Sequence, residues 1–244
     1  MTGRAVAVVI GLAVLLPACA ELTGSLSSDL GLTTSGGSGK YLTSEPTSAA
    51  LAAGAVAIPP GAMRYRRFLM QAWEYHFGLA EDPAIGFGQV HQESRFDCSA
   101  TSAGGSAGCA QFTPDTAQWI SSKIPEPVRS QCPKRSGCPM DPQWALTALV
   151  EYDWRLWGDA KAAANDRERW GFALSAYNGG AGWSSAESKA CGSSQGCDPA
   201  RYFDHVERFC GATGRSIAAC KENRHYPRLI LDHWTPLYRA WLRS

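Results

Sequence analysis

The sequence lacks several patterns that would place it in a common class of protein. It has no C-x-x-C pair, so the cysteine pair that usually binds structural zinc is missing. Its five histidines show no metal-ligand spacing, and we predict no metal and no cofactor. The formal charge is only +1 over 244 residues, which gives no electrostatic case for a nucleic-acid partner. No stretch alternates apolar and polar residues with a period of two, so we do not expect a β-sheet.

Residues 1–20 resemble an export signal with one charged residue, Arg4. The apolar run at 5–16 is too short for a transmembrane helix and fits the core of a signal peptide. The four residues ending at Cys19 resemble a bacterial lipobox, in which this cysteine is lipidated, although Pro17 stands where a small residue is usual. Ordinary signal cleavage is the alternative. Because no acidic retention signal follows Cys19, we expect an exported, periplasmic protein that is lipid-anchored to the outer membrane.

Residues 21–62 have the composition of a flexible linker, rich in Ser, Thr, Gly and Ala and with little periodicity. Such a segment buries too little apolar surface to offset the entropy of ordering it. Residues 63–244 are long enough to hold one hydrophobic core, and we expect a single domain there.

Within that domain, apolar residues recur at helical spacing, and prolines and capping residues mark several helix starts. The predicted helices are 64–79, 83–93, 114–120, 142–156, 166–177 and a C-terminal stretch from about 223. We expect Pro236 to kink or break the last of these. The predicted fold class is mainly α, with long loops at 98–110, 121–141 and 184–200.

Eight cysteines remain once Cys19 is set aside, and an even number in an exported chain indicates disulfides. They are Cys98, Cys109, Cys132, Cys138, Cys191, Cys197, Cys210 and Cys220. The sequence does not fix their pairing. Pairing in succession, which closes four short loops, is the arrangement we favour, and the loops are then pinned by disulfides.

Four short segments carry the functional signal, in the order 91–96 (HQESRF), 108–112 (GCAQF), 176–180 (AYNGG) and 222–226 (ENRHY). Their order and spacing resemble the soluble lytic transglycosylases, a family that shares the lysozyme-like fold of goose-type lysozymes. The family has a Glu-Ser pair, a Gly-Leu-Met-Gln box, an Ala-Tyr-Asn-x-Gly box and a closing Glu-Thr-x-x-Tyr motif. This sequence departs from the second box by a Cys-Ala pair, and Asn223 replaces the Thr of the last motif.

Glu93 is the candidate catalytic residue. Cleaving a glycosidic bond requires a proton for the leaving oxygen, and a carboxylic acid supplies it at neutral pH only if burial raises its pKa. Phe87 and Val90 give Glu93 an apolar flank, and Asp97 is the only nearby acid, beyond the helix end. The resemblance implies that the sugar's own C6 hydroxyl attacks the anomeric carbon. Glu93 would then be the sole general acid/base, cleaving the MurNAc–GlcNAc β-1,4 bond of peptidoglycan and leaving 1,6-anhydro-MurNAc ends.

The resemblance also assigns supporting roles. Ser94 and Gln111 would bind sugar or orient the site, the Tyr177 hydroxyl would steer the catalytic glutamate, and Asn178 would help shape the groove. Glycan strands of peptidoglycan are the implied partner.

In the fourth segment, Glu222 would be a secondary carboxylate of the substrate site, with Tyr226 packed beneath it. Trp119 and Trp183 are candidates for stacking on sugar rings, although core packing is the common fate of a tryptophan. The sequence assigns no oligomeric state.

Two other functions stay open: a hydrolytic lysozyme that uses water, and a non-catalytic peptidoglycan-binding scaffold. Two further motifs are weaker. Residues 104–108 match the G-x-S-x-G nucleophile elbow but lack the strand and helix it needs. His91-x-Glu93 occurs in zinc deaminases, whose Pro-Cys-x-x-Cys partner is absent.

Overall fold

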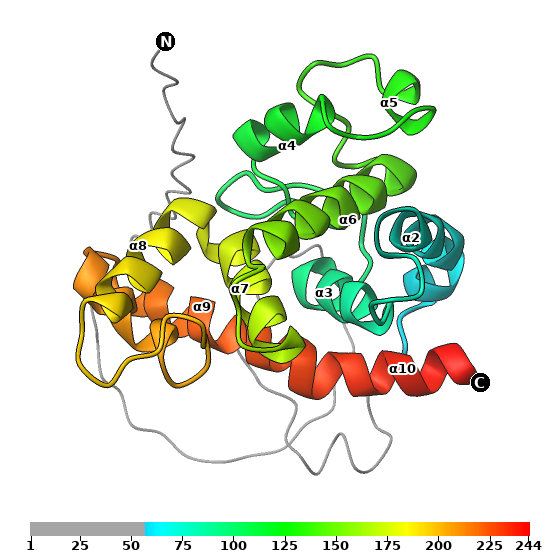
Figure 1. The fold of residues 1–244 in the computed structure, drawn as a ribbon. Helices are drawn as coiled ribbons and strands as arrows, with labels where there is room; N and C mark the ends of the chain where they lie inside the picture. The colour runs from blue at the N-terminus through cyan, green and yellow to red at the C-terminus, as the bar shows by residue number, and fades with distance from the viewer. Residues whose placement is uncertain (1–56) are drawn as a thin grey trace, which may run out of the picture.

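The computed structural model describes residues 57–244 and consists of helices joined by loops (Figure 1). In chain order the elements are α2 (Pro60–Phe77), α3 (Ala84–Ser94), α4 (Pro114–Ser121), α5 (Val128–Gln131), α6 (Pro142–Asp159), α7 (Asp166–Gly179), α8 (Ala181–Gly192), the 3-10 helix η1 (Val206–Thr213), α9 (Ile217–Arg228), the π-helix η2 (Leu229–Trp234) and α10 (Thr235–Arg243). Across this described part of the chain there is no β-strand, only two isolated bridges near residue 107. The predicted mainly α fold is confirmed.

The predicted signal at 1–20, the lipidation site Cys19 and nearly all of the linker predicted at 21–62 lie outside the described residues. Helix α2 begins at Pro60, so the last residues of that predicted linker are helical, and Ala62 is buried. No helix in residues 57–244 combines the length and the hydropathy that crossing a membrane requires.

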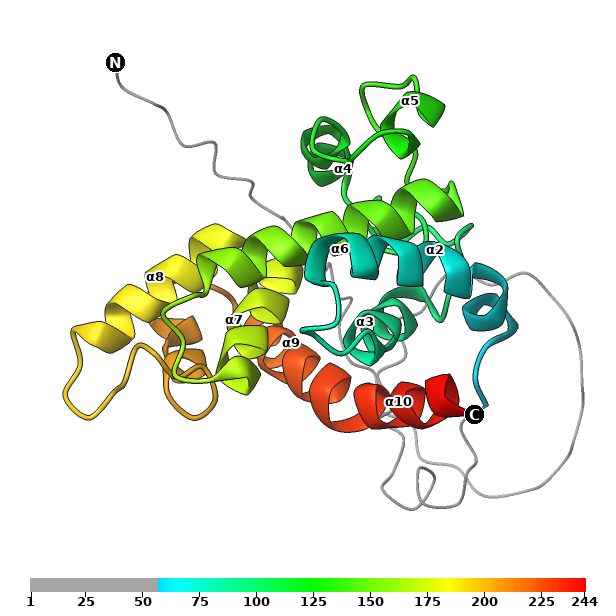
Figure 2. The same ribbon diagram turned by 45° about the vertical axis from the view of Figure 1, so that its right-hand side comes forward.

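Helix α3 lies at the centre of the domain, beneath α6 and α2 and above α10 in Figure 2. Every residue from Ala84 to His91 is buried, as expected of a helix enclosed on all sides. Two glycines allow this close packing. A Cβ at Gly86 would lie 2.8 Å from the Trp73 ring, and one at Gly88 would lie 2.8 Å from the Cβ of Trp234. The fold therefore surrounds the helix that carries the candidate catalytic residue.

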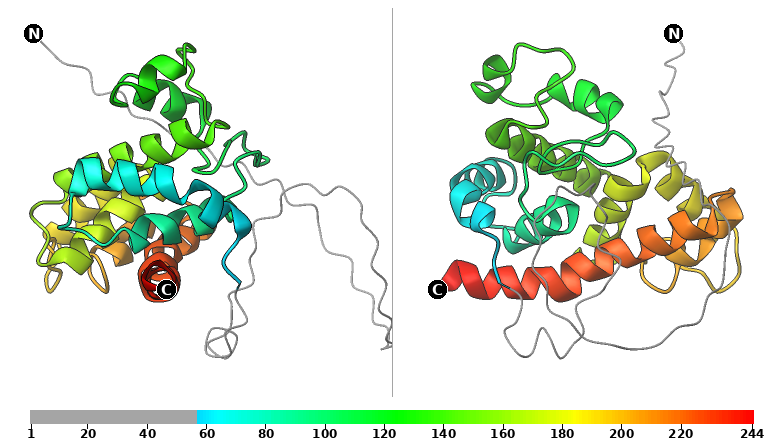
Figure 3. Two further views of the ribbon diagram at one scale, coloured as in Figure 1. Left: turned by 90° about the vertical axis from the view of Figure 1, so that its right-hand side faces the viewer. Right: turned by 180° about the vertical axis from the view of Figure 1, so that it is seen from behind.

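The elements α9, η2 and α10 run end to end as one helical rod along an edge of the domain (Figures 1 and 3). The sequence predicts a kink or break at Pro236, but the backbone stays helical through it, with a π-helical segment at Leu229–Trp234 just before. The Thr235 hydroxyl donates to the Ile230 carbonyl at 2.7 Å, which satisfies a backbone acceptor near the proline. A π turn of this kind accommodates the missing proline N–H.

The observed helix starts agree with the predicted ones where a capping residue precedes a proline. The Thr113 hydroxyl accepts from the backbone N–H of Thr116 at 3.2 Å, and α4 begins at Pro114. The Asp141 carboxylate likewise accepts from the N–H of Trp144 at 2.8 Å as α6 begins. Each side chain satisfies a backbone donor that has no partner within its helix.

The loop predicted at 184–200 is wrong for most of its length, because α8 occupies Ala181–Gly192. Only Glu187 and Cys191 of this helix are buried, so its sequence shows almost no apolar stripe from which to predict it. The short helix α5 within the predicted 121–141 loop and the 3-10 helix η1 were also not predicted.

Four disulfides pin the loops, and they pair the cysteines in succession as we favoured. They are Cys98–Cys109, Cys132–Cys138, Cys191–Cys197 and Cys210–Cys220. The first closes the loop that follows α3, and the last joins η1 to the first turns of α9.

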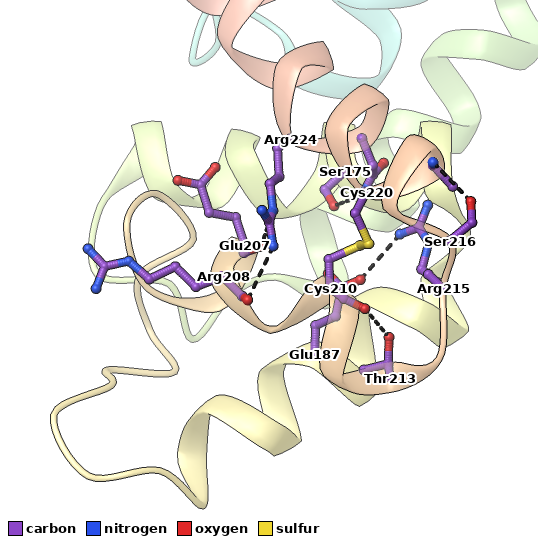
Figure 4. Close-up of a disulfide and its surroundings, with 12 residues drawn as sticks. Ser175, Glu187, Glu207, Arg208, Cys210, Thr213, Arg215, Ser216, Cys220 and Arg224 are labelled. Carbon is purple, nitrogen blue, oxygen red and sulfur yellow. Dashed lines mark hydrogen bonds and ion pairs between the residues drawn. A yellow bond between two sulfur atoms is a disulfide. The ribbon is translucent and has the colours of Figure 1, made fainter.

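Figure 4 shows the disulfide and the hydrogen bonds that join α9 to η1. Within η1, beside the Cys210–Cys220 disulfide, the Thr213 hydroxyl donates to the Cys210 carbonyl at 2.7 Å. The guanidinium of Arg224 donates to the backbone carbonyls of Glu207 at 2.6 Å and Arg208 at 3.2 Å. These contacts fix the helix that brings the fourth sequence motif to the centre of the domain.

Candidate active site

Glu93 lies in the last turn of α3 and is half-buried. Its carboxyl oxygen Oε1 accepts a hydrogen bond from the hydroxyl of Tyr226, which comes from α9. Burial raises the pKa of Glu93 to about 8; the Tyr226 hydrogen bond lowers it, and the negative charge of Glu222 raises it. The carboxyl is therefore protonated at neutral pH, the state that a general acid needs.

The chain turns sharply as soon as α3 has placed Glu93. Arg95 and Phe96 are both left-handed, with φ values of 54° and 64°. The N–H of Arg95 caps the helix by donating to the His91 carbonyl at 2.9 Å. Two successive non-glycine residues in this region are costly, and such strain persists where the surrounding structure enforces it. Here the turn sends the chain directly into the Cys98–Cys109 loop.

The side chain of Ser94 joins this loop to α3, and that of Gln111 makes hydrogen bonds within the loop. The Ser94 hydroxyl donates to the Cys109 carbonyl at 2.8 Å. The Gln111 amide donates to the carbonyls of Gly108 at 2.9 Å and Ala100 at 3.3 Å. Both residues were predicted to bind sugar or orient the site; in the structure their side chains donate to loop carbonyls, and the two roles stay predictions.

Gly108 has a clear steric requirement within the second motif. Its φ is +77°, and a Cβ there would lie 1.5 Å from the carbonyl oxygen of Pro139. No other residue fits this close approach of the two backbones.

The hydroxyl that contacts Glu93 is that of Tyr226, not that of Tyr177 as predicted. The Tyr177 hydroxyl donates to the Ala110 carbonyl at 2.8 Å, whereas the contact with Glu93 belongs to Tyr226. Tyr226 was predicted to pack beneath Glu222. Tyr177 still lies near the site. Burial raises the pKa of its hydroxyl, and the nearby charge of Glu93 raises it further.

Asn178 and Asn223 join the third motif to the fourth. The Asn178 amide donates to the Oδ1 of Asn223 at 3.1 Å, and the Asn223 amide donates to the Ser175 hydroxyl at 2.7 Å. A Cβ at Gly179 would come within 2.6 Å of the same Oδ1. Asn223, which stands where the family has threonine, therefore locks α9 against α7 and keeps Tyr226 facing Glu93. This role of Asn223 was not predicted from the sequence.

Aromatic rings lead from the surface towards Tyr177. Trp119 on α4 is 42% exposed and meets Tyr152 edge-on, with ring centroids 5.5 Å apart. The Tyr152 ring in turn lies 5.3 Å from that of Tyr177. Trp183 on α8 is partly exposed, with the guanidinium carbon of Arg215 at 5.8 Å from its ring centroid. Trp119 is thus the more accessible of the two tryptophans proposed for sugar stacking.

Two buried polar residues near Glu93 were not predicted as site residues. Asp153 on α6 is fully buried and accepts from the Gln89 amide at 3.2 Å. Its position was detectable, because Leu149, Asp153 and Leu156 fall at the i, i+4, i+7 spacing of a buried helix face. An acid on such a stripe needs an explanation.

His91 is a core residue. Its ring stacks on Trp234 with centroids 4.0 Å apart, and its Nδ1 lies 2.8 Å from the Tyr238 hydroxyl. Burial lowers the pKa of His91 to about 4, with a smaller effect from the charge of Arg95, so the ring is neutral.

Residues 70–195, just over half of the chain, match the family described as the transglycosylase SLT domain. The match contains Glu93, Gln111 and Tyr177 and ends before the α9 motif. No curated protein matches the chain. The domain of this family is lysozyme-like, in keeping with the helical fold and with the fold class expected from the motifs. The chain therefore belongs to the transglycosylase SLT-domain family.

Proposed function

We propose that this protein is a peptidoglycan lytic transglycosylase that cleaves the MurNAc–GlcNAc β-1,4 bond and leaves 1,6-anhydro-MurNAc ends. The observation that carries the proposal is the half-buried carboxyl of Glu93. Its pKa is raised to about 8, so it keeps its proton at neutral pH, and it accepts a hydrogen bond from Tyr226. Its position in the last turn of α3, within the matched family domain, adds support.

The cycle begins with Glu93 as the acid. It gives its proton to the glycosidic oxygen while the bond from that oxygen to the anomeric carbon breaks. The carboxylate left on Glu93 then accepts the proton of the C6 hydroxyl, whose oxygen bonds to the same anomeric carbon. The proton lost in the first step returns in the second, so Glu93 ends as it began. The Tyr226 hydroxyl, which donates to the carboxyl, stabilises the charged intermediate state of Glu93.

The other carboxyls that influence the site differ in what they can reach. Asp153 is fully buried and has no access to a sugar. Glu222 is exposed on α9, and its charge acts on Glu93. A second carboxylate at this place favours one alternative, a hydrolytic lysozyme in which Glu222 assists a water molecule. Replacing Glu222 by glutamine separates the two functions. The replacement would impair the lysozyme but not the transglycosylase, which needs no second carboxylate.

We infer that some residues contact the substrate directly and that others position the site. Trp119 offers an exposed ring for stacking on sugar, next to the aromatic row that leads to Tyr177. Ser94 and Gln111 contribute by fixing the loop at one side of Glu93. Asn178 contributes by fixing α9 through its bond to Asn223.

We also propose that the protein is exported and anchored in the outer membrane by a lipid on Cys19, with residues 21–62 as a tether. The lipobox-like sequence before Cys19 supports this.

Product analysis tests the proposed activity. Purified peptidoglycan is digested, and the muropeptides are identified by mass spectrometry. Anhydro ends support the transglycosylase, and reducing ends indicate a lysozyme. Binding to peptidoglycan without any cleavage product indicates a non-catalytic scaffold.

A further inference from the structure

A second carboxyl lies buried near Glu93. Asp153 projects from α6 and is fully buried, and it accepts from the amide of Gln89 at 3.2 Å. Gln89 precedes Glu93 by one helical turn on α3, so the two are neighbours on one face of that helix. The buried contact between Asp153 and Gln89 therefore joins α6 to the turn of α3 that carries the catalytic residue.

This pair has an unusual shortage of hydrogen-bond donors. In residues 57–244, neither the Oδ2 of Asp153 nor the Oε1 of Gln89 has a partner, and both atoms are buried. A buried acceptor without a hydrogen-bond partner destabilises the folded protein. An ionised Asp153 only accepts and cannot supply the missing donor. One proton on Oδ2 would allow it to donate to Oε1, which gives both atoms a partner.

The charges around Asp153 also disfavour its ionised form. Burial raises the pKa of its carboxyl well above the ordinary value, the Gln89 hydrogen bond lowers it, and the negative charge of Glu93 raises it further. No basic group in the described part of the chain is among those acting on it. The other titratable groups that face the pair are the hydroxyls of Tyr152, Tyr177 and Tyr226.

We propose that Asp153 is a positioning residue that acts as a neutral carboxylic acid, paired with Gln89 through two hydrogen bonds that fix the turn of α3 bearing Glu93. The inference rests on the proposed function, in which Glu93 is the acid. It adds that the two buried carboxyls have separate tasks. Glu93 releases and recovers its proton in each cycle, whereas Asp153 keeps its proton throughout.

Separate tasks have an electrostatic consequence. A neutral Asp153 leaves the pKa of Glu93 to burial, Tyr226 and Glu222. An ionised Asp153 would add a negative charge to the same buried region and raise the pKa of Glu93 further. The state of Asp153 is therefore visible in the alkaline limb of the pH–rate profile.

Two matched variants test the proposal on peptidoglycan as substrate. Asp153→Asn keeps the shape and neutrality of the acid, and its amide makes the same two hydrogen bonds with Gln89. Asp153→Leu keeps a similar volume but makes neither bond. We expect the asparagine variant to retain kcat within about threefold and to keep the alkaline limb at the wild-type pH. We expect the leucine variant to lose at least about tenfold in kcat with little change in KM, because a small misplacement of the acid is costly.

Two outcomes would overturn the proposal. An alkaline limb that moves down by about one pH unit or more in Asp153→Asn would mean that the wild-type residue is ionised. A leucine variant that folds and works as well as wild type would mean that the pair positions nothing.

A measurement that needs neither activity nor the leucine variant completes the test. In protein labelled with carboxyl-¹³C aspartate, the resonance of Asp153 is the one missing from the Asp153→Asn spectrum. We expect it to show the chemical shift of a protonated acid and no titration below the pKa of Glu93. An inflection near the ordinary aspartate value of about 4 would contradict the neutral acid. This result holds even if the enzyme proves inactive on peptidoglycan, so failure of this inference is separable from failure of the proposed function.

Discussion

The Tyr226 hydroxyl donates a hydrogen bond to the carboxyl of Glu93, although 133 residues separate the two in the chain. The contact joins α9 to the end of α3 and combines the last motif of the sequence with the first. This hydrogen bond also acts against burial in setting the pKa of Glu93. The function of this site depends on how well α9 is held in place.

Replacing Tyr226 by phenylalanine should show this dependence. The ring still packs, but the hydroxyl that stabilises the Glu93 carboxylate is lost, so we expect kcat to fall about 10–100-fold. The alkaline limb should move above pH 8, because the lost hydrogen bond is the one that lowers the Glu93 pKa. Steady-state kinetics across pH measure both effects.

Tyr177→Phe is the matched control, since that hydroxyl donates to the Ala110 carbonyl and not to Glu93. Its alkaline limb should stay in place. The assignment of the two tyrosines is wrong if only Tyr177→Phe shifts the limb.

Glu93→Gln should abolish cleavage and stabilise the folded protein at alkaline pH. Removing a general acid costs about 10²–10⁴-fold in rate. The folded-state pKa of Glu93 is raised to about 8 from 4.5. Its contribution to stability is therefore fully present below the unfolded pKa and is lost as the pH rises through the folded pKa.

Wild type should accordingly lose on the order of 3–5 kcal/mol relative to Glu93→Gln between about pH 4 and pH 9. Chemical denaturation of both proteins at the two pH values measures the difference. An equal pH dependence in the two proteins would show that Glu93 has an ordinary pKa.

Helix starts marked by a capping residue and a proline could be predicted from the sequence, as at Thr113 and Asp141. Helix α8 could not, because only Glu187 and Cys191 of its twelve residues are buried. Helical periodicity appears in a sequence only where one face of the helix meets the core. Helix α8 instead covers η1 and the end of α7 with few apolar residues.

The candidate catalytic residue could also be predicted from the sequence, but its partners could not. Local pattern places Glu93 at a helix end and Tyr177 and Tyr226 in helices. It does not reveal which hydroxyl meets the carboxyl, because that depends on how α9 is placed relative to α3 in the folded chain. The roles of Asn223 and Asp153 were missed for the same reason, since each acts through a side chain from another helix, although the stripe around Asp153 marks that residue as buried.

The disulfide at the start of α9 should matter for rate as well as for stability. Replacing Cys210 and Cys220 together by serine frees the segment that precedes Tyr226. We expect a loss of about 2–3 kcal/mol in stability and at least a tenfold fall in kcat. Serine replacement of Cys132 and Cys138 is the control, because that bridge closes a loop before α6. It should lower stability with little effect on kcat. Equal rate losses in both double variants would argue against positioning by the α9 disulfide.

The proposed lipid anchor predicts a membrane location that depends on Cys19. Wild-type protein should fractionate with the outer membrane, and Cys19→Ala should be released or retained with its signal uncleaved. Fractionation with the intact mass of the mature N-terminus measures this. A soluble wild-type protein that starts at Glu21 would contradict the anchor.

The most direct test of the central claim asks whether water enters the product. Peptidoglycan is digested in water enriched in the heavy isotope ¹⁸O, with Glu93→Gln as the inactive control. The masses of the muropeptides that carry the new MurNAc ends are then measured by mass spectrometry. Attack by the C6 hydroxyl predicts ends that carry no heavy oxygen and weigh one water less than reducing ends. A single heavy oxygen at each new reducing end would contradict the account and identify the enzyme as a hydrolase.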